Sequence, residues 1–237
     1  VDSTALPEQV CDAVMESAFG SAGQRCSALR ILCVQSDVAD EIIHMIKGAL
    51  ALRKLGDPVK PETDIGPIID EDARAILQKH VERMDKEARF IARAPLDESL
   101  QHGCYFAPAI YEISSLAQVQ REVFGPVLHI LRYKADQLDQ LMQNLAATGY
   151  GLTCGVHSRL EGRYLSLFEK SIAGNVYINR NMVGAVVGVQ PFGGRGLSGT
   201  GFKAGGPHYL LRFGSERVRT INTAAIGGNT DLFRLIG

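Results

Sequence analysis

Apolar runs alternate with amphipathic segments along most of this 237-residue chain, and this alternation limits the fold more than any other feature. The run Leu29–Val34 (LRILCV) is typical of a strand that is covered on both faces. A helical stripe follows it to Leu55, and we expect Ser36-Asp37 to cap this helix and Gly56 to end it. Because strand and helix alternate in this way, the sequence predicts an α/β fold with a largely parallel sheet flanked by helices.

The same reading places the remaining elements. Asp70 is a candidate N-cap for the second of the further helices, which we expect at residues 7–20, 70–88, 135–147 and 159–171. Strands are expected at residues 89–93, 105–113, 126–133, 152–157 and 175–179. Residues 216–223 (ERVRTINT) alternate polar and apolar side chains like a half-buried strand. A lone terminal strand needs a sheet edge to join, which another subunit can supply.

Composition narrows the function classes. The net charge is −1, so we expect no nucleic-acid partner, and no apolar run approaches the length of a membrane span. The five cysteines form no CxxC pair and have no histidine at a metal-ligand offset. The sequence therefore favours a cytoplasmic protein without a disulfide framework or a metal site.

Cys26 is the first candidate for chemistry. It lies between a helical pattern and a strand-like run, where a thiol can sit at the floor of a cleft, and the cation of Arg25 next to it favours the thiolate. The alternative is a buried, inert cysteine that behaves as a small hydrophobe. A cysteine hydrolase or acyltransferase that uses one of the six histidines as base also stays open.

Two further segments could meet a ligand. In Glu122-Val123-Phe124-Gly125-Pro126, the carboxylate can accept hydrogen bonds from a ribose diol and the phenyl ring can lie against an aromatic ring; the alternative is a solvated Glu and a core Phe. The glycine-rich stretch at residues 183–207 can bring its backbone close to a ligand. Its Gly194–Gly199 segment matches GxGxxG, but the glycines that follow prevent the long helix that a dinucleotide fingerprint requires.

Together these motifs resemble the aldehyde dehydrogenase superfamily, and the resemblance covers essentially the whole chain. Four ordered segments carry it: residues 23–26, 57–67, 122–126 and 191–194. Residues 24–28, 179–186 and 224–229 are more closely similar to the L-glutamate γ-semialdehyde (pyrroline-5-carboxylate) dehydrogenase region of the bifunctional proline utilization A family.

The resemblance implies a reaction. Cys26 would attack the aldehyde carbon to give a thiohemiacetal, hydride would pass to NAD, and water would release glutamate from the resulting thioester. The Cys26 backbone N–H would help to hold the oxyanion. Glu122 would bind the ribose next to the nicotinamide, with Phe124 beside the ring. The implied substrate-binding residues are Arg25, Ser27, Gly184, Ala185 and Phe192, and no metal is implied.

One departure from the family matters. Its general-base Glu motif is not found between Val1 and Cys26. We therefore expect residues 1–213 to be a catalytic domain from a longer chain whose Rossmann cofactor domain is absent here, and residues 214–237 to be an oligomerisation strand and tail. FAD would be needed only if a proline dehydrogenase region precedes this segment. The chain alone is expected to be inactive, so NADH production at the rate of a complete enzyme would contradict the expectation.

Three alternatives stay open: a dehydrogenase for another small-molecule aldehyde, a cysteine hydrolase or acyltransferase, and a non-enzymatic assembly module whose terminal strand docks on a partner. A homo-oligomer is the expected assembly.

Overall fold

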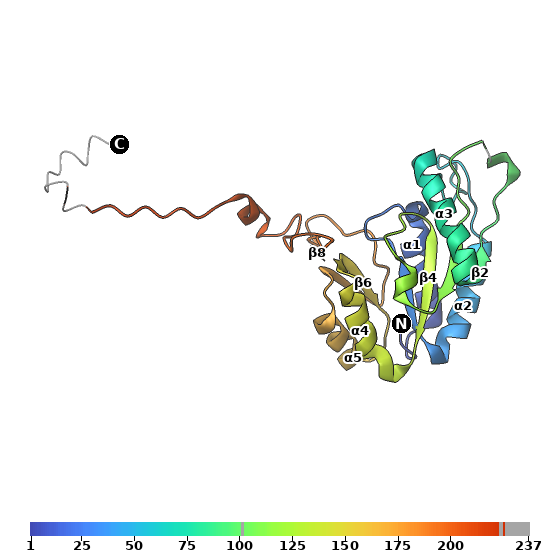
Figure 1. Ribbon diagram of the computed structural model, residues 1–237, viewed down its shortest axis with the longest axis horizontal. Coiled ribbons are helices and arrows are strands. Elements are labelled where there is room, and N and C mark those ends of the chain that lie inside the picture. The colour runs from blue at the N-terminus through green and yellow to red at the C-terminus, as the bar shows by residue number, and fades with distance from the viewer. Residues whose placement is uncertain (101, 223–224, 226–237) are drawn as a thin grey trace.

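A four-stranded sheet forms the centre of the larger unit (Figure 1). The computed structural model describes residues 1–100, 102–222 and 225. The strands lie in the order β1-β4-β3-β2, listed by bounds as β1 (Ile31–Gln35), β4 (Val127–Tyr133), β3 (Ala109–Ile113) and β2 (Arg89–Arg93). The pairs β1–β4 and β4–β3 are parallel, whereas β2 is antiparallel to β3. The sheet is therefore mixed, with a parallel majority and an antiparallel edge.

Helices cover this sheet and supply most of the core. They are α1 (Pro7–Phe19), α2 (Ser36–Ala51) and α3 (Glu71–Glu87). α1 packs on α2, and both contact β4, whose residues are buried except for the half-buried Arg132. α3 contacts β2 and buries Leu77, Val81 and Met84. Because β4 is covered on both faces, its sequence VLHILRY is apolar at almost every position rather than at alternate ones.

The helix ends test two predictions. Asp70 caps α3 as expected, since its Oδ1 accepts a hydrogen bond from the Ala73 N–H at 2.8 Å. The prediction for α2 was wrong at both ends. Ser36 lies inside the helix, where its hydroxyl donates to the Tyr133 carbonyl, and the helix ends at Ala51 rather than Leu55. The Asp64 carboxylate accepts the Lys54 N–H at 2.9 Å, so this backbone group bonds to a loop and does not continue the helix.

A smaller unit lies beside the main sheet (Figure 1). Strands β6 (Thr153–Val156) and β7 (Asn175–Ile178) pair in parallel, with helices α4 (Leu138–Ala147) and α5 (Glu161–Lys170) next to them. The short strands β5 (Tyr150–Gly151) and β8 (Arg195–Gly196) pair antiparallel. Short 3₁₀ turns η1–η5 complete the fold, at Gly20–Gly23, Glu98–Leu100, Leu116–Gln118, Ala135–Gln137 and Tyr209–Phe213.

Val1 and Asp2 connect the two units through backbone hydrogen bonds. The Val1 ammonium donates to the Cys33 carbonyl at 2.8 Å, and the Val1 carbonyl accepts from the Gln35 N–H at 3.0 Å. The Asp2 N–H donates to the His157 carbonyl at 3.2 Å. These two residues therefore lie between β1 and the end of β6.

Residues 214–222 lead away from both units (Figure 1). Residues 214–222 are exposed, and residues 216–222 form no strand in this single chain. The last residue of the predicted strand, 223, lies outside the described residues, as does most of the 224–229 segment. The terminal strand therefore stays a prediction. Within the described part of the chain, no helix is both long and apolar enough to cross a membrane.

Candidate active site

A sharp turn presents the Cys26 thiol. After α1 ends at Phe19, the residues Ser21, Ala22 and Gly23 have φ values of 53°, 53° and 65°. Such values are uncommon for residues with a side chain, and they cluster at functional sites. The turn leaves Cys26 exposed, whereas Cys11 is buried. The interpretation of Cys26 as a buried, inert cysteine is therefore wrong.

The loop that carries Cys26 (residues 20–26, the Cys26 loop) and the loop that carries Glu122 (residues 122–126, the Glu122 loop) touch backbone to backbone. A Cβ on Gly23 would lie far inside contact distance of the Gly125 carbonyl and 2.9 Å from the Ala18 carbonyl. A Cβ on Gly125 would collide with the side chain of Leu77. Glycine at position 23 thus allows two motifs that are about a hundred residues apart in sequence to meet, and glycine at position 125 leaves room for Leu77 of α3.

Arg30 joins these loops, and sequence reasoning missed it. Its Nη1 donates to the carbonyls of Gly23 at 2.6 Å and Gly125 at 3.2 Å. Its Nη2 donates to the Arg25 carbonyl at 3.1 Å and to Glu122 Oε1 at 3.4 Å. The sequence did carry a signal for Arg30, because it is the one charged residue in the otherwise apolar run at residues 29–34.

The charge next to the thiol loop is therefore not only that of Arg25. Arg25 directs its Nε to the Ser21 hydroxyl at 2.9 Å. Burial lowers the pKa of Arg30, and the negative charge and hydrogen bond of Glu122 oppose this effect. The guanidinium carbon of Arg30 also lies 4.9 Å from the centre of the Phe124 ring, which is a cation–π contact.

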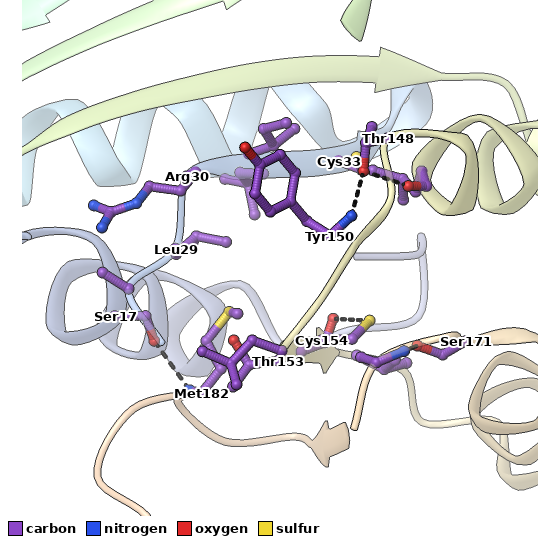
Figure 2. A pocket seen from close by; sticks show the side chains of 18 of the residues that line it. Ser17, Leu29, Arg30, Cys33, Thr148, Tyr150, Thr153, Cys154, Ser171 and Met182 are labelled. Carbon is purple, nitrogen blue, oxygen red and sulfur yellow. Dashed lines mark hydrogen bonds between the residues drawn. The ribbon is translucent and has the colours of Figure 1, made fainter. Parts of the chain in front are cut away.

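One cavity of about 510 Å³ collects these groups. Cys26, Arg30, Glu122 and Phe124 all line it, together with apolar residues of β1, α4 and β6. Figure 2 shows Leu29 and Arg30 on one wall and Thr153 and Cys154 on the opposite wall. A mostly apolar cavity with a few convergent polar groups is typical of a small-molecule site.

The predicted substrate-binding residues do not line this cavity. Ser27 is buried, and its carbonyl accepts a hydrogen bond from Thr153 Oγ1 at 3.4 Å. Gly184 has a φ of +71° and open space around it. Phe192 exchanges two backbone hydrogen bonds with Ala204. The structure thus brings the predicted nucleophile and cofactor residues together, and it leaves Arg25, Ser27, Gly184, Ala185 and Phe192 outside the lining.

The glycine-rich segment still starts at the cavity. Met182 lines it, and the Met182 N–H donates to the hydroxyl of Ser17 on α1 at 3.1 Å (Figure 2). Gly184 follows two residues later. Its neighbour Ala185 is half-buried.

One histidine, His157, lines the same cavity as Cys26, and burial lowers its pKa to about 4. In the part of the chain that the structure describes, no hydrogen bond joins a histidine to Cys26. His129 is fully buried, with Nε2 at 2.8 Å from His80 Nε2 and Nδ1 at 2.9 Å from the Arg30 carbonyl. Among residues 1–100, 102–222 and 225, no group of three or more metal-ligating side chains is present.

Comparisons with known proteins show which family the chain resembles. A family model described as "Aldehyde dehydrogenase family" matches residues 1–218. The chain is 50% identical over 222 residues to the "Bifunctional protein PutA" of Escherichia coli (strain K12), which covers 92% of this chain and 17% of that protein. It is 36% identical over 213 residues to the "1-pyrroline-5-carboxylate dehydrogenase" of Geobacillus sp. (strain WCH70), covering 89% of this chain and 41% of that protein.

Solved structures of similar proteins match the fold of this chain. A crystal structure of bifunctional proline utilization A (PutA) matches with a TM-score of 0.87 and 54% identity, covering 94% of this chain and 23% of that one. A 1-pyrroline-5-carboxylate dehydrogenase from Thermus with bound NAD matches with a TM-score of 0.82 and 31% identity, covering 90% of this chain and 40% of that one. The chain thus spans less than half the length of each of these proteins. Because the family model matches nearly all of its residues, the chain belongs to the aldehyde dehydrogenase family.

Proposed function

We propose that this chain carries the nucleophile of an NAD-dependent dehydrogenase that oxidises L-glutamate γ-semialdehyde, the open form of pyrroline-5-carboxylate, to L-glutamate. The observation that carries the proposal is the exposed Cys26 thiol, which shares one cavity with Glu122 and Phe124. The name of the similar 1-pyrroline-5-carboxylate dehydrogenase supports the choice of substrate.

Cys26 provides covalent catalysis. Its thiolate attacks the aldehyde carbon, so that a C–S bond forms and the carbonyl electron pair moves to oxygen. The Cys26 backbone N–H donates to that oxyanion. The carbon bound to Cys26 would then lose a hydride as its C=O bond forms again, and NAD, when bound, would supply the hydride acceptor. Water then attacks the thioester on Cys26 and releases one proton to solvent, the C–S bond breaks with its electron pair on sulfur, and the thiolate and the carboxylic acid product separate.

The residues that would hold the cofactor fit this task. The Glu122 side chain is 42% exposed, and its Oε1 accepts a hydrogen bond from Arg30. In the described residues its second oxygen accepts no hydrogen bond, so it can accept from a ribose diol. Phe124 is 46% exposed and lines the same cavity, where its ring can lie against a flat heteroaromatic ring.

The other end of the substrate would meet the glycine-rich segment. In this proposal the backbone N–H groups of Gly184 and Ala185, with Arg25 and the Ser27 hydroxyl, bind the α-carboxylate, and Phe192 packs on the aliphatic part. The position of Met182 on the cavity wall supports this assignment, because it places the start of the segment at the site.

We also propose a division of labour along the chain. Residues 1–213 form the catalytic unit, and residues 214–237 form an assembly tail that pairs with another copy. The exposed apolar side chains Val218 and Ile221 support this role, since a single chain leaves them uncovered.

Protection from alkylation tests the proposed site. The purified chain is treated with iodoacetamide with and without L-glutamate γ-semialdehyde, and mass spectrometry measures the labelling rate of each cysteine. At a concentration of about four times its Kd, the aldehyde should slow the labelling of Cys26 roughly fivefold. Cys104, whose thiol donates to Glu71, is the internal control and should label at an unchanged rate.

Two comparisons sharpen the result. Butanal, which lacks the carboxylate, should protect Cys26 less than the semialdehyde does. A Cys26→Ala chain should lose the protected peptide and label normally elsewhere. Equal labelling of Cys26 with and without aldehyde would refute the proposed function.

A further inference from the structure

Arg30 makes contacts that packing alone does not explain. Its side chain is only 14% exposed, and its Nε is buried without a hydrogen-bond partner among the described residues. An unpaired buried donor is destabilising, and an apolar side chain of similar volume often stabilises as well as a buried ion pair does. This position therefore bears a cost that a methionine would avoid.

The contacts of Arg30 fall on two loops at once. Nη1 bonds the carbonyls of Gly23 and Gly125, one from each loop. Nη2 repeats the pattern with the Arg25 carbonyl and the Glu122 carboxylate. The rigid fork of a guanidinium suits this task, and a lysine ammonium could not satisfy all four acceptors with the same geometry.

The same guanidinium carries a charge next to the nucleophile. It bonds the carbonyl of the residue before Cys26, and both side chains line the cavity. Glu122 takes up part of that charge through a pair at 3.4 Å. The field at the sulfur therefore depends on how strongly Glu122 holds Arg30.

We propose that Arg30 is a positioning residue, which fixes the Cys26 loop against the Glu122 loop. Its guanidinium also places a positive charge beside the Cys26 sulfur, and the carboxylate of Glu122 partly neutralises this charge. This inference rests on the proposed function, because the proposed function gives Cys26 and Glu122 their roles. It adds that the cofactor loop and the nucleophile loop are connected through one side chain.

Two alkylating reagents of different charge test the electrostatic part. Iodoacetate is an anion and iodoacetamide is neutral, so the ratio of their rates at Cys26 reports the charge near the sulfur and not its exposure. Arg30→Met should lower this ratio roughly threefold or more, and Arg30→Lys should keep it within about twofold of the original chain. Glu122→Gln should raise the ratio, since Arg30 then has no carboxylate partner. The ratio at Cys104 is the internal reference.

Hydrogen exchange tests the positioning part. In Arg30→Lys and Arg30→Met, the amides of residues 23–26 and 122–125 should exchange faster together, because both loops lose the same fork. Exchange that increases in one loop only would overturn the proposal that Arg30 holds the two loops together. Unchanged reagent ratios in Arg30→Met and Glu122→Gln would overturn the charge effect.

These outcomes stay separate from the proposed function. Neither measurement uses NAD or an aldehyde, so a negative result here leaves the protection experiment to decide the proposed function by itself. If Arg30→Met fails to fold, Arg30→Gln decides, because it removes the charge, keeps a polar side chain at position 30 and must lower the ratio.

Discussion

Buried His129 gives the chain a defined response to acid. Burial lowers its pKa from 6.5 to about 4, and the pKa of its partner His80 also falls to about 4, mainly by burial. Between these values the unfolded chain binds a proton that the folded chain does not bind. The free energy of unfolding therefore decreases as the pH falls from 6.5 towards 4, and His129 contributes no pH dependence above that window.

The expected size can be measured. For His129, a fall from pH 7 to pH 5 should reduce the free energy of unfolding by about 2 kcal/mol. Urea unfolding of the chain and of His129→Phe at both pH values measures this, because the phenyl ring cannot titrate. Parallel pH curves for the two proteins would show that His129 is not responsible.

Gly23 provides a second prediction at the residue scale. Gly23→Ala should destabilise the chain by about 3 kcal/mol or more, because the methyl group meets the Gly125 backbone and the φ of +65° is strained for alanine. Gly184→Ala is the matched control. Its φ of +71° is similar but its surroundings are open, so it should cost only about 1 kcal/mol. Equal losses in urea unfolding would mean that the loop contact contributes nothing.

Sequence reasoning located part of the site and missed the rest for a physical reason. Cys26, Glu122 and Phe124 stand in short motifs, and the structure places all three on one cavity. Arg30 stands inside a run that reads as a strand, so its role depends on a contact with Gly125 that no local pattern encodes. The predicted substrate residues lie on segments whose position depends on tertiary contacts, and the roles given to them remain proposals.

At the scale of elements, the N-cap of α3 at Asp70, a prediction that the structure confirms, can be tested by mutation. Asp70→Ala should cost about 1 kcal/mol, since the Ala73 N–H loses its acceptor and the helix loses a negative charge at its N-terminus. Ser36→Ala is the comparison. Ser36 bonds the Tyr133 carbonyl and caps nothing, so its loss should leave the start of α2 equally protected in hydrogen exchange, whereas Asp70→Ala should loosen the first turn of α3.

Elements with a strong period were predictable, and elements made by contacts were not. Strand β2 occupies the predicted residues 89–93, and α1 ends one residue before the predicted boundary. The end of α2 depends on Asp64, which lies outside the helix and competes for its backbone. The pairing of β5 with β8 involves only two residues on each strand, and no periodicity can appear over so short a length.

At the scale of the whole molecule, the described residues 214–222 are exposed, so we expect that deleting the tail leaves the core intact. Deletion of residues 214–237 should change the free energy of unfolding of the remaining chain by no more than about 0.5 kcal/mol, because residues 214–222 are exposed. If the tail mediates assembly, light scattering should show a lower mass for the deleted chain. An unchanged mass would dismiss the assembly role.

The general architecture followed from the alternation of strands and helices, but its division into two units did not. The sequence predicted one largely parallel sheet, whereas β6 and β7 form a separate pair. Hydrophobic patterns report which residues are buried and not which strand edges meet, so the placement of Val1 and Asp2 between β1 and β6 could not be read in advance.

The apposition of Gly23 and Gly125 has a consequence for anyone who redesigns this scaffold. The two backbones touch, and the guanidinium of Arg30 bonds both. A mutagenesis library that diversifies only the Cys26 loop would therefore mostly return variants whose new side chains collide with the Glu122 loop. Pairwise diversification of both loops, with position 30 included, gives each change a chance of compensation. The effective unit of selection in such a campaign is the pair of loops.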